Sequence, residues 1–121
     1  MVNTLTFEDI KRAISDENYF IFKAVADDEI VGFVMLQKTD ELNVESIAVK
    51  KEFRNLGLAT KLIDLAEQTA KENQISTLSL EVSFKNINAF LLYEKLGFKE
   101  RRIRKGYYSD GADCIEMTKN V

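Results

Sequence analysis

The order of apolar and polar residues predicts that strands dominate the first half of the chain. Two apolar runs, YFIFKAVA at Tyr19–Ala26 and IVGFVML at 30–36, are separated only by an acidic turn, which is typical of a β-hairpin. A third run at Leu42–Val49 follows a short polar turn. Connections this short join antiparallel neighbours, so a three-stranded meander is expected. Ahead of it, Thr6 and Asp9 have the spacing of a capping box and predict a short helix at 6–16.

The period of the apolar residues changes from two to about 3.6 at the middle of the chain. A single helical stripe ends near residue 73 and contains Leu58, Leu62, Leu65, Ala66 and Thr69. The run STLSLEV at 76–82 predicts a strand, and a crossover connection places it parallel to the strand at Leu42–Val49. A second helix is expected at 86–96, followed by strands at 98–108 and 113–118. The predicted fold class is α/β (α+β), with a mixed, mostly antiparallel sheet and flanking helices.

The first of these helices begins without a capping side chain. The preceding stretch KKEFRNLGLATKL, 50–62, contains no Ser, Asp or Pro, so the free amides of the first turn lack an obvious acceptor. Such amides form an anion site, and Gly57 allows a ligand to approach the backbone closely. A diphosphate would suit this loop; the alternative is a charged surface loop with one turn glycine. The spacing matches neither a P-loop nor a dinucleotide fingerprint.

Composition limits the chemistry and the size of the protein. The 121 residues, 1–121, suit one domain. With no histidine and a single cysteine, Cys114, histidine-based nucleophilic catalysis is excluded and no metal site is expected. No apolar run is long enough to span a membrane and no signal peptide is evident, so a cytoplasmic protein is expected. The net charge of −3 argues against nucleic-acid binding.

Two segments resemble the hallmarks of the GCN5-related N-acetyltransferases. SIAVKKEFRNLGLATKLI is similar to their acetyl-coenzyme A motif, in which a strand and a short loop lead to Arg/Gln-x-x-Gly-x-Gly/Ala at the start of a helix. LEVSFKNINAFLLYEKLGF is similar to the second hallmark, with matches at Asn86, Ala89, Tyr93, Gly97 and Phe98. The resemblance extends from about residue 7 to the C-terminus. It is greatest to the ribosomal-protein-alanine N-acetyltransferase group, which acetylates protein N-termini.

This resemblance implies the GNAT fold, here without its usual first strand and helix, and acetyl-coenzyme A as cosubstrate. The residues that it implies for the thioester and pantetheine arm are Ile47, Ala48 and Val49, through their backbone. Those that it implies for the diphosphate region are Arg54, Asn55, Leu56, Gly57, Leu58, Ala59 and Thr60, and Asn86 would also contact the cofactor. In the same group Glu81 corresponds to the proton acceptor and Tyr93 to the proton donor.

The two proposed catalytic residues suit an α-amine acceptor. An α-amine has a pKa of ~8 against ~10.4 for lysine, so about a fifth of it is neutral at pH 7.4 and a carboxylate base suffices. Glu81 lies on the strand face opposite Leu78, Leu80 and Val82, although a solvent-facing glutamate would show the same pattern. Tyr93 is equally consistent with a core aromatic. A backbone N–H near Ala48 or Val49 would polarise the thioester carbonyl.

Several alternatives remain open at this point. The acceptor could be a small amine such as a polyamine or aminoglycoside, or the chain could be a non-catalytic coenzyme A-binding module. The basic stretch KERRIRK, 99–105, indicates a solvated face; it could also bind an acidic substrate, a ribosomal surface or the 3′-phosphate. Tyr107 and Tyr108 could line the acceptor slot or only pack, and Cys114 is expected in the core. The late start predicts that Tyr19–Ala26 is an exposed edge strand, which a homodimer would cover.

Overall fold

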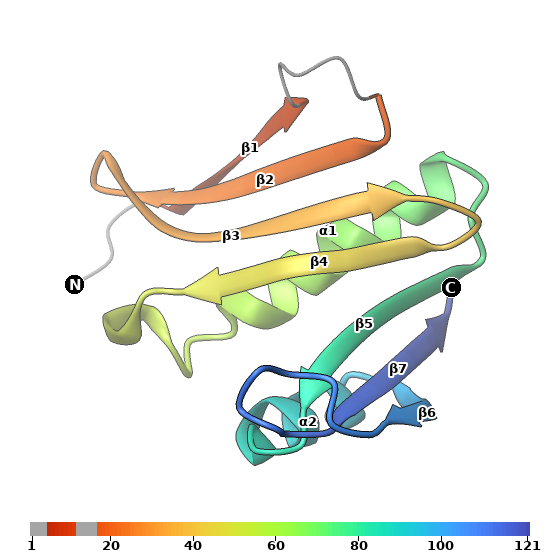
Figure 1. The fold of residues 1–121 in the computed structure, drawn as a ribbon. Helices are drawn as coiled ribbons and strands as arrows, with labels where there is room; N and C mark the ends of the chain where they lie inside the picture. The colour runs from red at the N-terminus through yellow and green to blue at the C-terminus, as the bar shows by residue number, and fades with distance from the viewer. Residues whose placement is uncertain (1–4, 12–16) are drawn as a thin grey trace.

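In the computed structural model, one twisted mixed sheet contains all the strands of the described residues (Figure 1). The structure describes residues 5–11 and 17–121, and of residues 5–11 only the backbone. Within these residues the sheet has seven strands in the order β1-β2-β3-β4-β5-β7-β6. The elements are β1 (Leu5–Lys11), β2 (Tyr19–Ala26), β3 (Glu29–Lys38), β4 (Leu42–Val49), η1 (Lys51–Phe53), α1 (Leu58–Glu72), β5 (Thr77–Ser83), α2 (Ile87–Lys95), β6 (Lys99–Arg104) and β7 (Cys114–Asn120).

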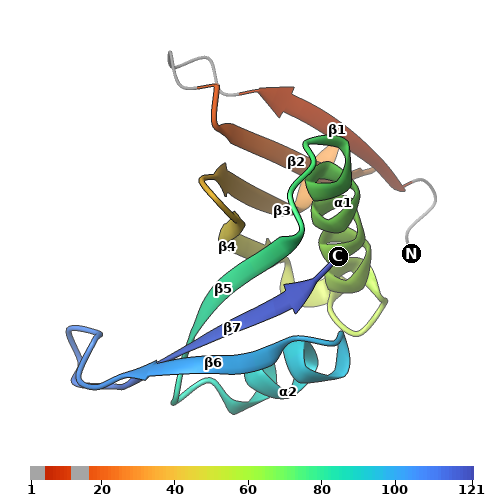
Figure 2. The ribbon, with the colours of Figure 1, turned by 90° about the vertical axis from the view of Figure 1, so that its right-hand side faces the viewer.

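The predicted connectivity from residue 19 onward is confirmed. Strands β2, β3 and β4 form the antiparallel meander, and β5 pairs parallel to β4. Helix α1 connects β4 to β5 and lies alongside these strands (Figure 2). Helix α2 ends next to Gly97, which has the left-handed φ of +99° expected of a C-terminal cap.

Both helices pack on the apolar face of the sheet. The predicted stripe of α1 is buried at Leu58, Leu62, Ala66 and Thr69 and half-buried at Leu65. Burial of each leucine contributes about 1.5–3 kcal/mol relative to its exposure. Side chains of α2 contact the same core. Within 5–11 and 17–121, no helix is long and apolar enough to cross a membrane.

The N-terminal helix prediction is wrong where the structure describes the chain. Residues 5–11 form β1, which pairs with β2 from Leu5 opposite Ala26 to Lys11 opposite Phe20, while 12–16 lie outside the described residues. The capping-box spacing is a local signal, whereas the edge of β2 offers a ladder seven residues long, and the tertiary contact prevails. A strand therefore precedes β2, contrary to the expectation of a missing first strand. Strand β2 lies between β1 and β3 and is not an edge strand. The exposed edge from which a homodimer was predicted is therefore absent at β2.

The ladder between β4 and β5 is short, and this determines where a site can form. The two strands pair only at Leu42–Leu78, Asn43–Ser79 and Val44–Leu80. At the next residue, Glu45, the β3–β4 register shifts, with Leu36 opposite Val44 and Met35 opposite Ser46, which is a β-bulge. Beyond it, β4 and β5 diverge (Figure 1). The remainder of β4 therefore has a backbone edge that no strand of residues 5–11 or 17–121 occupies.

We expect Gly32→Val to destabilise the protein by about 1–3 kcal/mol through overpacking. A Cβ at Gly32 would lie 3.1 Å from Ala48 O and 3.1 Å from Leu58 Cδ2, so β3 would be pushed away from both β4 and α1. Urea unfolding measures the change. The control is Ile30→Val on the same strand, where the side chain is 52% exposed; an equal loss in both variants would contradict the expectation.

Candidate active site

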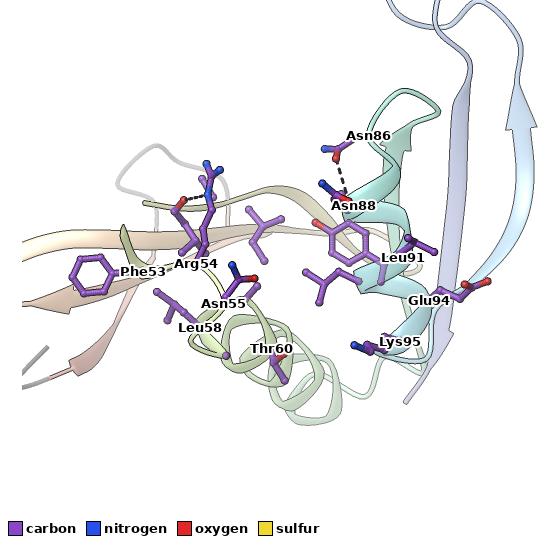
Figure 3. A pocket seen from close by; sticks show the side chains of 18 residues that line it. Phe53, Arg54, Asn55, Leu58, Thr60, Asn86, Asn88, Leu91, Glu94 and Lys95 are labelled. Carbon is purple, nitrogen blue, oxygen red and sulfur yellow. Dashed lines mark hydrogen bonds between the residues drawn. The ribbon is translucent and has the colours of Figure 1, made fainter. Parts of the chain in front are cut away.

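A groove of about 1300 Å³ lies between the end of β4, the start of α1 and helix α2. Figure 3 shows Arg54, Asn55 and Thr60 on one side and α2 residues such as Asn88 on the other. Ten of the eleven residues predicted to bind the cofactor line it: Ile47, Ala48, Val49, Arg54, Asn55, Gly57, Leu58, Ala59, Thr60 and Asn86. The eleventh, Leu56, does not line the groove, and its side chain is 63% exposed.

The free edge of β4 presents hydrogen-bonding groups toward this groove. The Lys50 N–H donates to Val31 O at 2.8 Å, and backbone groups of successive strand residues point to opposite edges. Ala48 therefore directs its N–H and C=O to β3, while Ile47 and Val49 direct theirs to the edge from which β5 has diverged. Ladder geometry thus makes Val49, rather than Ala48, the candidate donor for polarising a carbonyl.

Arg54 completes this end of the strand. Its Nε donates to Val49 O at 3.0 Å (Figure 3). The Val49 carbonyl, which the β3–β4 ladder leaves free, is therefore occupied, whereas the Val49 N–H makes no turn, loop or cap hydrogen bond to the described backbone. Arg54 thus orients the peptide groups at the end of β4, and it also lines the groove.

Helix α1 begins without a side-chain cap, as the sequence predicts. Its N-cap is Gly57 at φ +79°, no side chain among residues 17–121 caps its first turn, and that turn contains no acidic residue. The first residue whose N–H reaches a backbone carbonyl is Lys61, which bonds to Gly57 O at 3.1 Å. The amides of Leu58, Ala59 and Thr60 are the orphan donors of a helix start. Together with the positive end of the helix dipole they suit an anionic ligand.

Tyr93 and Asn86 come from the α2 side of the groove. The Asn86 side chain accepts a hydrogen bond from Ala89 N at 3.2 Å and so caps α2. Tyr93 lines the groove and packs edge-on against Phe98, with ring centroids 6.0 Å apart. Burial raises the pKa of the Tyr93 phenol above its ordinary value. The hydroxyl therefore keeps its proton at neutral and moderately alkaline pH.

Glu81 lies apart from the groove lining, on the other face of the sheet. It is exposed while its neighbours Leu80 and Val82 are buried, so the predicted alternation is confirmed. Its Oε1 accepts a hydrogen bond from the Tyr107 hydroxyl at 3.2 Å. Glu81 is also the first β5 residue beyond the last β4–β5 pair, which places it where the two strands begin to separate.

The basic stretch forms an ion-pair network rather than only a solvated face. The side chains of β6 do not alternate strictly between the two faces of the sheet, because the β6–β7 register shifts between Glu100 and Arg102. Arg101 bonds to both carboxylate oxygens of Glu41, at 2.5 and 2.9 Å, and to Glu116 at 3.0 Å. The Glu41 contact joins the turn before β4 to the far edge strand across two intervening strands. Sequence reasoning missed both carboxylates.

The remaining residues of the C-terminal hairpin have mixed outcomes. Cys114 is fully buried, as predicted. The Tyr107 ring packs edge-on against Tyr108 at 5.1 Å, and burial followed by a hydrogen bond with Cys114 raises the pKa of Tyr108 to about 12. Among the residues whose side chains are described, no cluster of His, Cys, Asp or Glu could hold a metal ion.

Comparison with known proteins identifies the kind of protein to which this site belongs. The Acetyltransferase (GNAT) family matches residues 2–98. An N-alpha-acetyltransferase of Saccharolobus solfataricus is 35% identical, over 81% of this chain and 67% of that protein. Other curated relatives are covered over 52% to 71% of their length.

Solved structures of acetyltransferases have the same fold as this chain. The ribosomal-protein-S18-alanine N-acetyltransferase of Escherichia coli superposes with a TM-score of 0.85 at 26% identity, over 98% of this chain and 94% of that one. An acetyltransferase of the same family from Elizabethkingia anophelis, with acetyl-CoA bound, superposes with a TM-score of 0.85 at 19% identity, over 97% and 98%. The second likeness shows the fold alone.

We expect Asn86→Ala to lower the free energy of unfolding by about 0.5–2 kcal/mol, because it removes the cap of α2. Asn88→Ala is the matched control, since Asn88 is exposed in the first turn of the same helix but is not its cap. Chemical denaturation of both variants measures the difference. Equal stabilities would show that the Ala89 N–H is satisfied in another way.

Proposed function

The chain belongs to the acetyltransferase (GNAT) family, and from this premise we propose that it transfers an acetyl group from acetyl-coenzyme A directly to a protein N-terminal α-amine. The observation that carries the proposal is the groove, where the uncapped start of α1 adjoins the free edge of β4. The first feature suits a diphosphate and the second suits an amide-containing arm. The names of the relatives, N-alpha-acetyltransferase and ribosomal-protein-alanine N-acetyltransferase, support the choice of acceptor.

In this proposal the two substrates approach from opposite faces of the sheet. The thioester arm lies along β4 on the helix side, where Tyr93 lines the groove. The acceptor amine approaches Glu81 on the other face. Because β4 and β5 separate immediately before Glu81, the separation is the one place along these strands where groups from both faces can meet.

The reaction needs no covalent enzyme intermediate. The neutral amine attacks the thioester carbonyl carbon, a C–N bond forms and the C–S bond breaks. Glu81 accepts the proton that the amine loses, directly or through water, and Tyr93 donates a proton to the departing thiolate. The Val49 N–H stabilises the negative charge that develops on the carbonyl oxygen.

The chemistry favours an α-amine over a lysine acceptor. At pH 7.4 about one lysine in a thousand is neutral, against about a fifth of an α-amine, and a carboxylate is too weak a base to offset that difference. Assays with N-terminal peptides, lysine peptides, a polyamine and an aminoglycoside identify the acceptor. Transfer to the small amines but not to peptides would overturn this part of the proposal. Tight binding of acetyl-coenzyme A without transfer to any acceptor would favour a binding module.

We expect Gly57→Ala to weaken acetyl-coenzyme A binding about tenfold, a loss of ~1.4 kcal/mol, because a methyl group at φ +79° would strain the loop and stand where the diphosphate approaches. Gly111→Ala is the control, since Gly111 also has a left-handed φ of +84° and open space around it but does not line the groove. Both changes should cost about 1–2 kcal/mol of stability. Isothermal titration calorimetry separates them; equal affinities would argue against phosphate binding at this loop.

We expect Tyr93→Phe to lower kcat about tenfold or more with the Kd of acetyl-coenzyme A nearly unchanged, because only the proton donor is lost. Since burial raises the pKa of Tyr93, the alkaline fall in kcat caused by this residue should lie above pH ~10. Initial rates across pH, together with calorimetry, test both statements. Unchanged turnover in the variant would remove Tyr93 from the mechanism.

A further inference from the structure

Two carboxylates face each other across adjacent strands on the face of the sheet that carries Glu81. Glu81 on β5 lies directly opposite Glu116 on β7 in the antiparallel register. Like charges in this arrangement repel one another, and Glu116 is only 7% exposed. The repulsion therefore needs a compensating cation within the same cluster.

Three arginines of β6 compensate Glu116. Arg101 and Arg104 donate hydrogen bonds to it at 3.0 Å each, and Arg102 lies 3.5 Å away. Burial alone would raise the pKa of Glu116, but the hydrogen bonds from Arg101 and Arg104 outweigh it and hold the pKa below its ordinary value. Glu116 thus remains an anion at neutral pH, and both of its carboxylate oxygens are engaged by these arginines.

Arg104 alone of the three also reaches Glu81. Its Nη2 binds Glu116, while its Nε lies 3.8 Å from Glu81 Oε2, too far for a hydrogen bond. This Nε is buried and, among the described side chains, is the one buried polar atom without a hydrogen-bond partner. The same guanidinium lies over the ring of Tyr107, 5.8 Å from its centroid, and the Tyr107 hydroxyl donates to Glu81.

We propose that Arg104 is a positioning residue for the reaction, which together with Tyr107 holds the Glu81 carboxylate oriented beside Glu116 while leaving it free to accept a proton. This inference rests on the function proposed above, because it assigns Glu81 the role of base. A direct hydrogen bond from Arg104 would occupy a lone pair of the Glu81 carboxylate and make it a poorer proton acceptor. The 3.8 Å separation supplies the field of a cation without occupying the lone pairs of the carboxylate.

Several polar groups face Glu81, and Arg104 is the cation among them. These are Arg104 from β6, Tyr107 and Tyr108 from the following loop, and Cys114 and Glu116 from β7. The pKa values of Tyr107, Tyr108 and Cys114 are all raised, that of Tyr107 first by the charge of Glu81 and those of Tyr108 and Cys114 first by burial. These three are therefore neutral at pH 7, and Arg104 and Glu116 supply the facing charges. Removal of Arg104 leaves Glu81 opposite the Glu116 carboxylate without this cation beside it, and like-charge repulsion would then turn the Glu81 side chain away.

The test compares Arg104→Gln with Arg102→Gln, because Arg102 also contacts Glu116 but is not among the described residues that form an ion pair with Glu81. In Arg104→Gln we expect kcat to fall about tenfold or more, because the base is no longer held in place, with the KM for acetyl-coenzyme A unchanged. Arg102→Gln should leave kcat unchanged. Arg104→Lys keeps the charge and should restore most of the parent kcat. Equal kcat values for Arg104→Gln and Arg102→Gln would overturn the proposal.

A second measurement does not depend on turnover. At pH 7.5 the ¹³C resonance of the Glu81 carboxyl carbon, assigned with Glu81→Gln, should shift in Arg104→Gln and stay in place in Arg102→Gln. No shift in either variant would overturn the proposal even in an active enzyme. A shift in Arg104→Gln alone, in a protein that binds acetyl-coenzyme A but transfers nothing, would support the Arg104–Glu81 coupling while refuting the acetyltransferase reaction. Circular dichroism confirms that each variant is folded.

Discussion

The brevity of the β4–β5 ladder is the constraint on which the rest of the site depends. Three residue pairs hold the strands together, and the bulge at Glu45 redirects β4 before a fourth pair can form. A fully paired sheet would satisfy every backbone group of β4 and leave no edge for a ligand. The separation leaves the backbone of Ile47 and Val49 available, and because α1 follows β4 along the chain, its uncapped start adjoins the same groove.

Much of this could be predicted from the sequence, because the signals were local or strongly periodic. The stripe from Leu58 to Thr69 specified α1 and its buried face. The absence of a capping residue before Gly57 correctly predicted the unsatisfied helix start. Alternation in β5 placed Glu81 away from the core. The roles assigned to Glu81 and Tyr93 stay proposals, and so does the acceptor.

The failures have one physical cause, which is that tertiary pairing outweighs local preference. Residues 5–11 carry a helix-like spacing but complete a ladder on β2, and this also removed the exposed edge on which a dimer was argued. A register shift beside Arg101 could not be read from alternating charges. Glu41 and Arg101 are far apart in sequence, and only the sheet order brings the turn before β4 near β6. A partial signal existed in Glu116, a charged residue among the apolar residues of β7.

The Arg101–Glu41 contact has a mechanical consequence for the sheet. It links the turn before β4 to β6, at the end where β4 and β5 are still paired. It therefore restrains the two halves of the sheet close to the point from which they diverge. Ion pairs in contact with water weaken as counter-ions accumulate around them. The restraint that this ion pair places on the separation of β4 and β5 should therefore weaken as ionic strength rises, without any change in the hydrophobic core.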